Sequence, residues 1–175
     1  TGRMDDFVGL GGIVGFNAGG IFNCALEDNF GSVELDCIGG IAGLNIGSKG
    51  EQKDKLYQDV LGREWLYKPG IIAACSAAEG RNLFGGSFVG GIAGYNMVGG
   101  ILEDNVSLIH VTAAGNYAGG IAGCNAGTVT VAEDTGTKNR NIRAASGEGV
   151  GGIIGWNQEK GIVTVKASGL GTDQR

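Results

Sequence analysis

The sequence predicts an all-β fold: a parallel, right-handed β-helix (β-solenoid) of about five coils, each with three short strands. The first observation is a repeat, since the segment Gly-Gly-Ile-x-Gly-x-Asn begins at residues 11, 39, 90, 119 and 151. The second is its spacing: the starts are 28, 51, 29 and 32 residues apart, which indicates one regular period with a single long interruption. The third is that short β-like runs between turn residues fill each period, while helical periodicity is missing across most of the chain.

The composition is that of one ordered domain. Glycine contributes 37 of the 175 residues, yet proline occurs once, so the chain is not collagen-like. The hydrophobic content of 42% is enough for a core and excludes a disordered chain. We expect residues 1–175 to form a single solenoid domain that is a fragment of a larger protein, because the chain has no initiating Met and no signal peptide.

Each period contains three strand-like runs in a fixed order. The motif itself supplies the first run. A second run follows the motif asparagine after a short turn, as in 20–26, 70–77, 127–133 and 161–167, and a third precedes the next motif, as in 32–38, 105–113 and 141–145. Parallel strands that are joined by turns must pair with the coils above and below, which leaves free edges only at the two ends. Right-handed winding is the expectation for such crossovers.

The constant positions of the motif predict two structural columns. Because successive side chains of a strand point to opposite faces, the motif isoleucine and asparagine share one face. We expect an interior column of stacked isoleucines: Ile13, Ile41, Ile92, Ile121 and Ile153. We expect a hydrogen-bonded amide ladder where each strand ends: Asn17, Asn45, Asn96, Asn125 and Asn157. The alternative is that these five amides bind a ligand.

The variable positions of the motif predict a different surface. The residues before the asparagines are Phe16, Leu44, Tyr95, Cys124 and Trp156. They are expected on the opposite face together with Val14, Ala42, Ala93, Ala122 and Ile154. An apolar stripe of this kind is typical of a contact surface. The alternative is that the insert or a neighbouring domain covers it.

The long interruption predicts an insert at residues 48–69. Its apolar residues follow helical spacing, which indicates a short amphipathic helix that projects from the second coil and ends near Pro69. Tyr57, Trp65 and Tyr67 are candidates for a partner contact, since insertions in repeat proteins often lie on a binding face. Alternatively, they pack the helix against the flank of the solenoid.

Few residues suggest catalysis or metal binding. Pairs of acidic residues occur at 27–28, 103–104 and 133–134. Clustered carboxylates of this kind could serve a polysaccharide lyase or hydrolase. The simpler interpretation is that they are solvated charges at the corners of the coils. His110 is the one histidine and lies in no catalytic motif, and no CxxC pair exists. Four cysteines could form two disulfides, but we favour free, buried thiols. We expect no cofactor and no metal.

The charge and hydropathy exclude two classes of partner. The net charge is −5, and a strongly basic stripe is absent, so binding to nucleic acid is not expected. The longest apolar run, residues 71–75, is far shorter than the ~20 residues of a membrane span.

The repeat resembles the GLUG motif, a short bacterial repeat. The resemblance lies in LGGIVGFNAGGIFNC (10–24), VGGIAGYNMVGGI (89–101), AGGIAGCNAGTVTV (118–131) and VGGIIGWNQEKGIVTV (150–165). It implies a secreted or cell-surface bacterial protein, attached to the cell wall, such as an adhesin or the non-catalytic region of an IgA-specific metallopeptidase. The catalytic HExxH motif of that peptidase is absent. We therefore expect a non-catalytic module that binds a host protein or a glycan, or acts as a rigid spacer between neighbouring domains of its chain.

Overall fold

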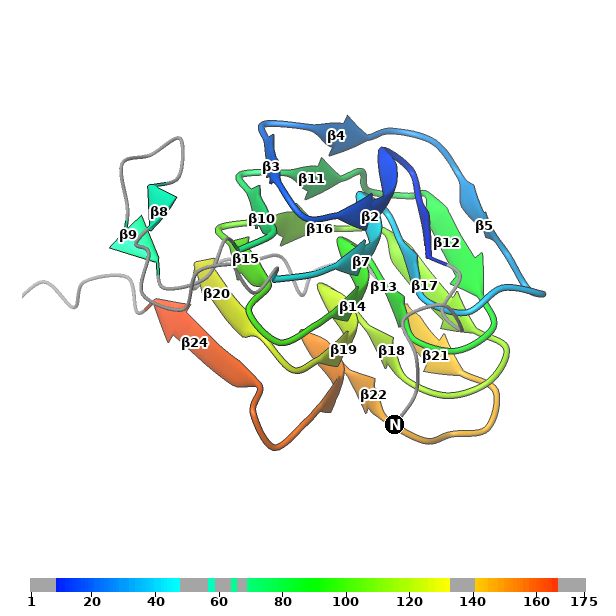
Figure 1. Cartoon of the computed structure of the whole chain (residues 1–175). Coiled ribbons are helices and arrows are strands. Elements are labelled where there is room, and N and C mark those ends of the chain that lie inside the picture. Colours follow the sequence, from blue (N-terminus) through cyan, green and yellow to red (C-terminus); the bar gives the residue numbers. More distant parts are fainter. Residues whose placement is uncertain (1–8, 48–56, 59–63, 66–68, 133–140, 167–175) are drawn as a thin grey trace, which may run out of the picture.

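The computed structural model is an all-β solenoid in which the chain winds repeatedly through stacked parallel sheets (Figure 1). It describes residues 9–47, 57–58, 64–65, 69–132 and 141–166. Each copy of the motif opens a new level of the stack, and we number these levels 1 to 5 in chain order.

The motif forms two of the sheets. Sheet A consists of the strands that enter the motif: β1 Leu10–Gly11, β6 Ile38–Gly39, β13 Val89–Gly90, β18 Ala118–Gly119 and β22 Val150–Gly151. Sheet B consists of the strands that end at its asparagine: β2 Val14–Asn17, β7 Ala42–Asn45, β14 Ala93–Asn96, β19 Ala122–Asn125 and β23 Ile154–Asn157.

The segments between the motifs form the other three sheets of the solenoid. Sheet C contains β3 Gly20–Phe22, β10 Ile71–Ala73, β15 Ile101–Glu103, β20 Thr128–Ala132 and β24 Ile162–Lys166. Sheet D contains β4 Ala25–Leu26, β11 Ser76–Ala77 and β16 Val106–Ser107. Sheet E contains β5 Phe30–Ser32, β12 Asn82–Gly85, β17 His110–Ala113 and β21 Ile142–Ala144.

The prediction of an all-β parallel solenoid is confirmed, but the prediction of five coils with three strands each is wrong. The five motif copies mark out about four complete turns. The described part of level 5 passes through sheets A, B and C only and ends at Lys166. Each of the first three turns contains five short strands, because two corners divide the longer runs expected from the sequence, and the described part of the fourth turn contains four. One corner is the Gly-Gly-Ile segment, and the other has left-handed backbone at Asn23 (φ 54°), Ala74 (φ 53°) and Asp104 (φ 50°).

The prediction of a helix in the insert is also wrong. Within the insert the structure describes two short strands, β8 Tyr57–Gln58 and β9 Glu64–Trp65, which pair antiparallel with Tyr57 opposite Trp65. Aromatic residues favour strands, and Gly62, between the strands in sequence, weakens the helical pattern. The spacing of apolar residues alone did not distinguish a hairpin from a helix.

The solenoid interior is filled by one cluster of buried aliphatic side chains from all five sheets. The motif isoleucines Ile41, Ile92 and Ile121 are fully buried in it, whereas Ile13 at level 1 is 49% exposed and Ile153 at level 5 is half-buried. The difference follows from position, since the two end levels have a neighbouring level on one side only.

The Gly-Gly-Ile corner breaks the expected alternation of side chains. The N–H groups of Ile92 and Ala93 both donate to the carbonyl oxygen of Ile121, at 2.9 and 3.0 Å, as in a β-bulge. As a result both Ile92 and Ala93 lie in the core, so the expectation that the residue after isoleucine faces outward is wrong. A Cβ at Gly90 would overlap the Ala93 carbonyl oxygen, which explains why glycine precedes this corner.

Candidate functional site

The motif asparagines form a continuous ladder of side-chain hydrogen bonds along the corner between sheets B and C. Each Nδ2 donates to the Oδ1 of the next level at 2.8 Å, in the order Asn17, Asn45, Asn96, Asn125, Asn157. The amides also donate to backbone carbonyls, such as Asn45 to Gly70 at 2.9 Å. Asn45, Asn96 and Asn125 are fully buried, so their amide groups are committed to the scaffold and do not reach a ligand.

A stack of aromatic rings runs along the solenoid surface and joins residues that precede the strands of sheet A to residues within the strands of sheet B. We call Phe88, Tyr95, Tyr117 and Trp156 the aromatic corner. The ring of Tyr117 lies 5.2 Å from that of Phe88 and 5.0 Å from that of Trp156, with interplanar angles of 22° and 26°. Phe88 also stacks on Tyr95 at 6.2 Å. Each such pair contributes about 0.5–1.5 kcal/mol beyond the area that it buries.

The backbone that carries this stack is strained. Cys37 (φ 54°), Phe88 (φ 58°) and Tyr117 (φ 64°) occupy the left-handed region at equivalent positions of levels 2, 3 and 4. Gly149 has φ 61° at the equivalent position of level 5. A bulky residue in this region costs about 1–3 kcal/mol and persists only where the surroundings compensate. At Phe88 and Tyr117 the ring contacts offset this cost, so the aromatic corner holds its rings on a defined backbone conformation.

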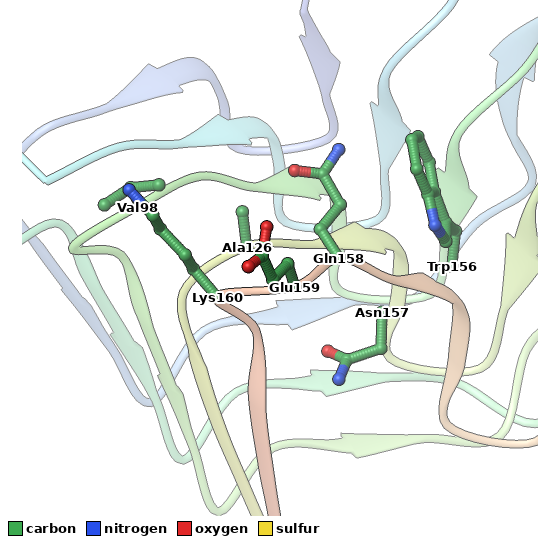
Figure 2. A pocket seen from close by; sticks show the side chains of 7 residues that line it. All are labelled: Val98, Ala126, Trp156, Asn157, Gln158, Glu159 and Lys160. Atoms are coloured by element: carbon green, nitrogen blue, oxygen red, sulfur yellow. The ribbon is translucent and has the colours of Figure 1, made fainter.

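An open depression of about 430 Å³ lies beside the aromatic corner. It arises from unequal turns between sheets B and C: four residues follow the asparagine at level 3 (97–100) and at level 5 (158–161), but only two at level 4 (126–127). Ala126 of the short turn therefore lies recessed between two longer turns. Figure 2 shows Val98 and Lys160 at one side of this turn notch and Trp156 at the other.

Polar groups complete the turn notch. Gln158 and Glu159 line it between Lys160 and Trp156 (Figure 2). Gln158 is held in place because its Oε1 accepts a hydrogen bond from the Tyr95 hydroxyl at 3.0 Å. An exposed indole beside an amide, a carboxylate and an ammonium group provides an apolar surface with polar groups close to it, which suits small polar ligands.

Beneath the aromatic corner lie two buried thiols. Burial raises the pKa of Cys37 to about 12, with a further contribution from the Asp36 carboxylate. Burial also raises the pKa of Cys124 to about 12, and burial raises that of the Tyr95 hydroxyl. All four cysteines are free, and three are buried, so these thiols act as small apolar side chains and not as nucleophiles.

The structure separates the acidic pairs. Glu27 and Asp28 are exposed directly after a strand of sheet D, whereas Glu103 ends a strand of sheet C. Asp104 forms an ion pair with Lys166 at 2.7 Å, and both side chains are about half exposed. The pair at 133–134 lies outside the described residues. The two described pairs thus lie at different corners and do not form a column of carboxylates.

His110 has a structural contact. It is half-buried at the start of β17, and its Nδ1 accepts a hydrogen bond from the backbone N–H of Asn141 at 2.9 Å. This contact joins levels 3 and 4. Within the described part of the chain, no three His, Cys, Asp or Glu side chains converge to form a group that could hold a metal ion.

The proposed contact residues are divided between several places. Phe16 and Trp156 are 44% and 42% exposed at levels 1 and 5, Tyr95 is half-buried, and Leu44 is buried. The insert residues Tyr57 and Trp65 are described only as backbone positions, and Tyr67 lies outside the described residues. No helix in the described ranges has the length and hydropathy that a membrane span requires.

Sequence reasoning did not identify Phe88, Tyr117 or the turn notch. The signals were present: an aromatic residue stands before the strand entering the motif in two copies, and the level-4 turn is two residues shorter than its neighbours. Neither signal is informative until adjacent levels are aligned in space.

The stacked levels, the buried isoleucines and the amide ladder define the class of this protein as a parallel β-solenoid. No family model matches the chain, and neither do the curated proteins or the solved structures with which it was compared.

Proposed function

We propose that this chain is a non-catalytic β-solenoid module whose aromatic corner and turn notch bind a glycan or a protein presented by a host. The observation that carries the proposal is the aromatic corner itself. Two of its members, Phe88 and Tyr117, occupy backbone positions that are costly for bulky residues, and the stack of rings ends in the 42% exposed ring of Trp156. A scaffold alone requires no aromatic residues at these positions, since glycine adopts the same conformation at level 5.

The chemistry of the turn notch favours a glycan among the candidate ligands. The apolar face of a pyranose packs on an indole, while its hydroxyls need donors and acceptors in the same small region. Trp156, Gln158, Glu159 and Lys160 supply these groups within one turn of chain. The resemblance to the GLUG repeat supports a location on the surface of a bacterial cell or in its secretions, with the solenoid also acting as a rigid spacer.

Binding and catalysis are separated by one set of assays. Wild-type protein is tested on a glycan array and a host-protein array, beside Trp156→Ala and the matched control Val33→Ala, which truncates a 60% exposed side chain on a different corner. We expect a bound ligand to be lost with Trp156→Ala and retained with Val33→Ala. Equal loss in both variants, or binding to neither array, would contradict the binding role.

The enzymatic alternative is tested with the same preparations. Polysaccharides are incubated with wild-type protein and with Asp104→Ala, which removes the carboxylate paired with Lys166. Turnover of any polysaccharide that disappears in Asp104→Ala would overturn the non-catalytic assignment.

A further inference from the structure

Two cysteines lie directly opposite each other on adjacent levels, at the corner between sheets C and D. Strand β3 pairs in register with β10 before this corner, and β4 pairs in register with β11 after it. Cys24 of level 1 is therefore opposite Cys75 of level 2. Neighbouring parallel strands lie about 4.7–4.9 Å apart, which is within the Cα separation of about 4.4–6.8 Å that a disulfide requires.

Both side chains point toward the solenoid interior. Cys75 is buried in the core cluster, and the half-buried Cys24 packs against this cluster. The Cys75 Sγ accepts a hydrogen bond from the backbone N–H of Cys24 at 3.4 Å. Burial raises the pKa of the Cys75 thiol, and the proximity of the Cys24 thiol raises it further. The two thiols thus share one side of the corner and lie close enough to interact.

Backbone contacts alone do not require cysteine at this corner. The next position of the same column is Asn105 at level 3, whose Oδ1 accepts the backbone N–H of Cys75 at 2.9 Å. Asn105 is buried, so the corner has room for an amide side chain. Sulfur is a weak acceptor, and asparagine therefore satisfies this backbone donor better than cysteine does. What the two cysteines add is a matched pair of thiols.

The other two cysteines do not form such a pair. Cys37 directly precedes the level-2 strand of sheet A, and Cys124 lies in the level-4 strand of sheet B. They are two levels apart, which corresponds to about 9.5 Å along the stack. Cysteines whose Cα atoms are more than about 7 Å apart cannot be bridged without movement of the backbone.

We propose that Cys24 and Cys75 form a disulfide in oxidising surroundings, and that this bond staples level 1 to level 2 of the solenoid. It joins residues 51 positions apart and encloses the second motif copy and the insert. A disulfide stabilises mainly by restricting the unfolded chain, and its effect increases with the length of the closed loop. The staple and the aromatic corner lie at different corners, so the staple does not depend on the proposed binding role.

The oxidant is a small disulfide such as oxidised glutathione. The thiolate of Cys24, the less buried of the two, attacks one glutathione sulfur, which forms a mixed disulfide and releases one glutathione thiol. The thiolate of Cys75 then attacks the Cys24 sulfur, forms the protein disulfide and releases the second glutathione thiol. Two cysteine thiols are oxidised, one glutathione disulfide is reduced, and the two protons pass to the released thiols. The second step is intramolecular, which offsets the small thiolate fraction of a buried cysteine.

The first test maps the disulfides of the wild-type chain. The protein is equilibrated with oxidised glutathione, quenched with acid, alkylated in denaturant and digested with trypsin and a Glu-specific protease. Cleavage after Glu27 and Glu34 separates Cys24 from Cys37. Mass spectrometry is expected to detect one linked species that contains Cys24 and Cys75, with Cys37 and Cys124 alkylated.

The second test compares thermal unfolding of the oxidised and reduced forms. We expect oxidised wild type to unfold about 5–15 °C above the reduced form. In Cys24→Ala and in Cys75→Ala, a reducing agent should leave the melting temperature unchanged. Cys37→Ala retains the pair and is the matched control, so it should show the same difference as wild type.

Four results would overturn the proposal. These are full alkylation of Cys24 or Cys75 after treatment with oxidised glutathione, a glutathione mixed disulfide that persists on Cys24, a disulfide between Cys75 and either Cys37 or Cys124, and equal melting temperatures of the oxidised and reduced forms. The peptide map and the comparison of oxidised with reduced protein both use wild type, so they decide the matter even where an alanine variant fails to fold.

Discussion

Replacing Asn96 by alanine tests whether the amide ladder stabilises the stack. The Asn96 Nδ2 donates to Asn125 Oδ1 at 2.8 Å, and its Oδ1 accepts from Asn45 Nδ2 at 2.8 Å. Each bond contributes about 1 kcal/mol net, and leaving buried amide partners unsatisfied costs about a further 1–3 kcal/mol, so the expected loss is about 3–5 kcal/mol. For a domain of this size a loss of 4 kcal/mol lowers the Tm by about 12 °C.

The matched variant is Asn157→Ala at the exposed end of the same ladder. Its Oδ1 accepts one ladder bond, from Asn125, and water can replace the groups that it loses. We expect a loss of about 1 kcal/mol. Urea unfolding followed by circular dichroism measures both variants against wild type. If the two substitutions destabilise the protein equally, within about 0.5 kcal/mol, the ladder does not stabilise through burial and the reasoning is refuted.

Three further predictions concern the core, the corner and the thiols. Ile92→Ala, at a fully buried position, is expected to lower the free energy of unfolding by about 2–5 kcal/mol. Ile13→Ala is expected to lower it by less than about 1.5 kcal/mol, because Ile13 is 49% exposed. Similar losses in the two variants would contradict an interior isoleucine column. Gly91→Ala should prevent or severely weaken folding because its Cβ would overlap the backbone of the next level. The Cβ of Gly152→Ala, at the same motif position, would meet no described atom within 4 Å, so this variant should retain the wild-type melting temperature. The raised pKa of Cys37, about 12 against 9.0, favours the folded state below pH 9, and this stability is lost as pH rises from 9 toward 12. A pH series of urea midpoints should therefore decline less steeply in Cys37→Ala, and an identical decline would exclude this thiol as a cause.

The architecture could be predicted because its signal is local and repeated. One Ile and one Asn recur at the same offset from a Gly pair, and stacking like residues at each level is the arrangement that buries the first and pairs the second. The insert was not predictable in this way. It occurs once, so no repetition separates chance spacing from a pattern, and the spacing of its apolar residues fits a helix where two described segments pair as strands.

The sequence by itself determined that this protein is a β-solenoid, where its levels begin, and which residues form the amide ladder. Tertiary structure alone decided the number of complete turns, the bulged corner that directs both Ile92 and Ala93 inward, and the aromatic corner. The physical reason is distance along the chain. Tyr117 and Trp156 are 39 residues apart in sequence, yet their rings stack at 5.0 Å because one level of the solenoid separates them. The turn notch likewise results from comparing turns of adjacent levels, a relation that exists only once the levels are stacked.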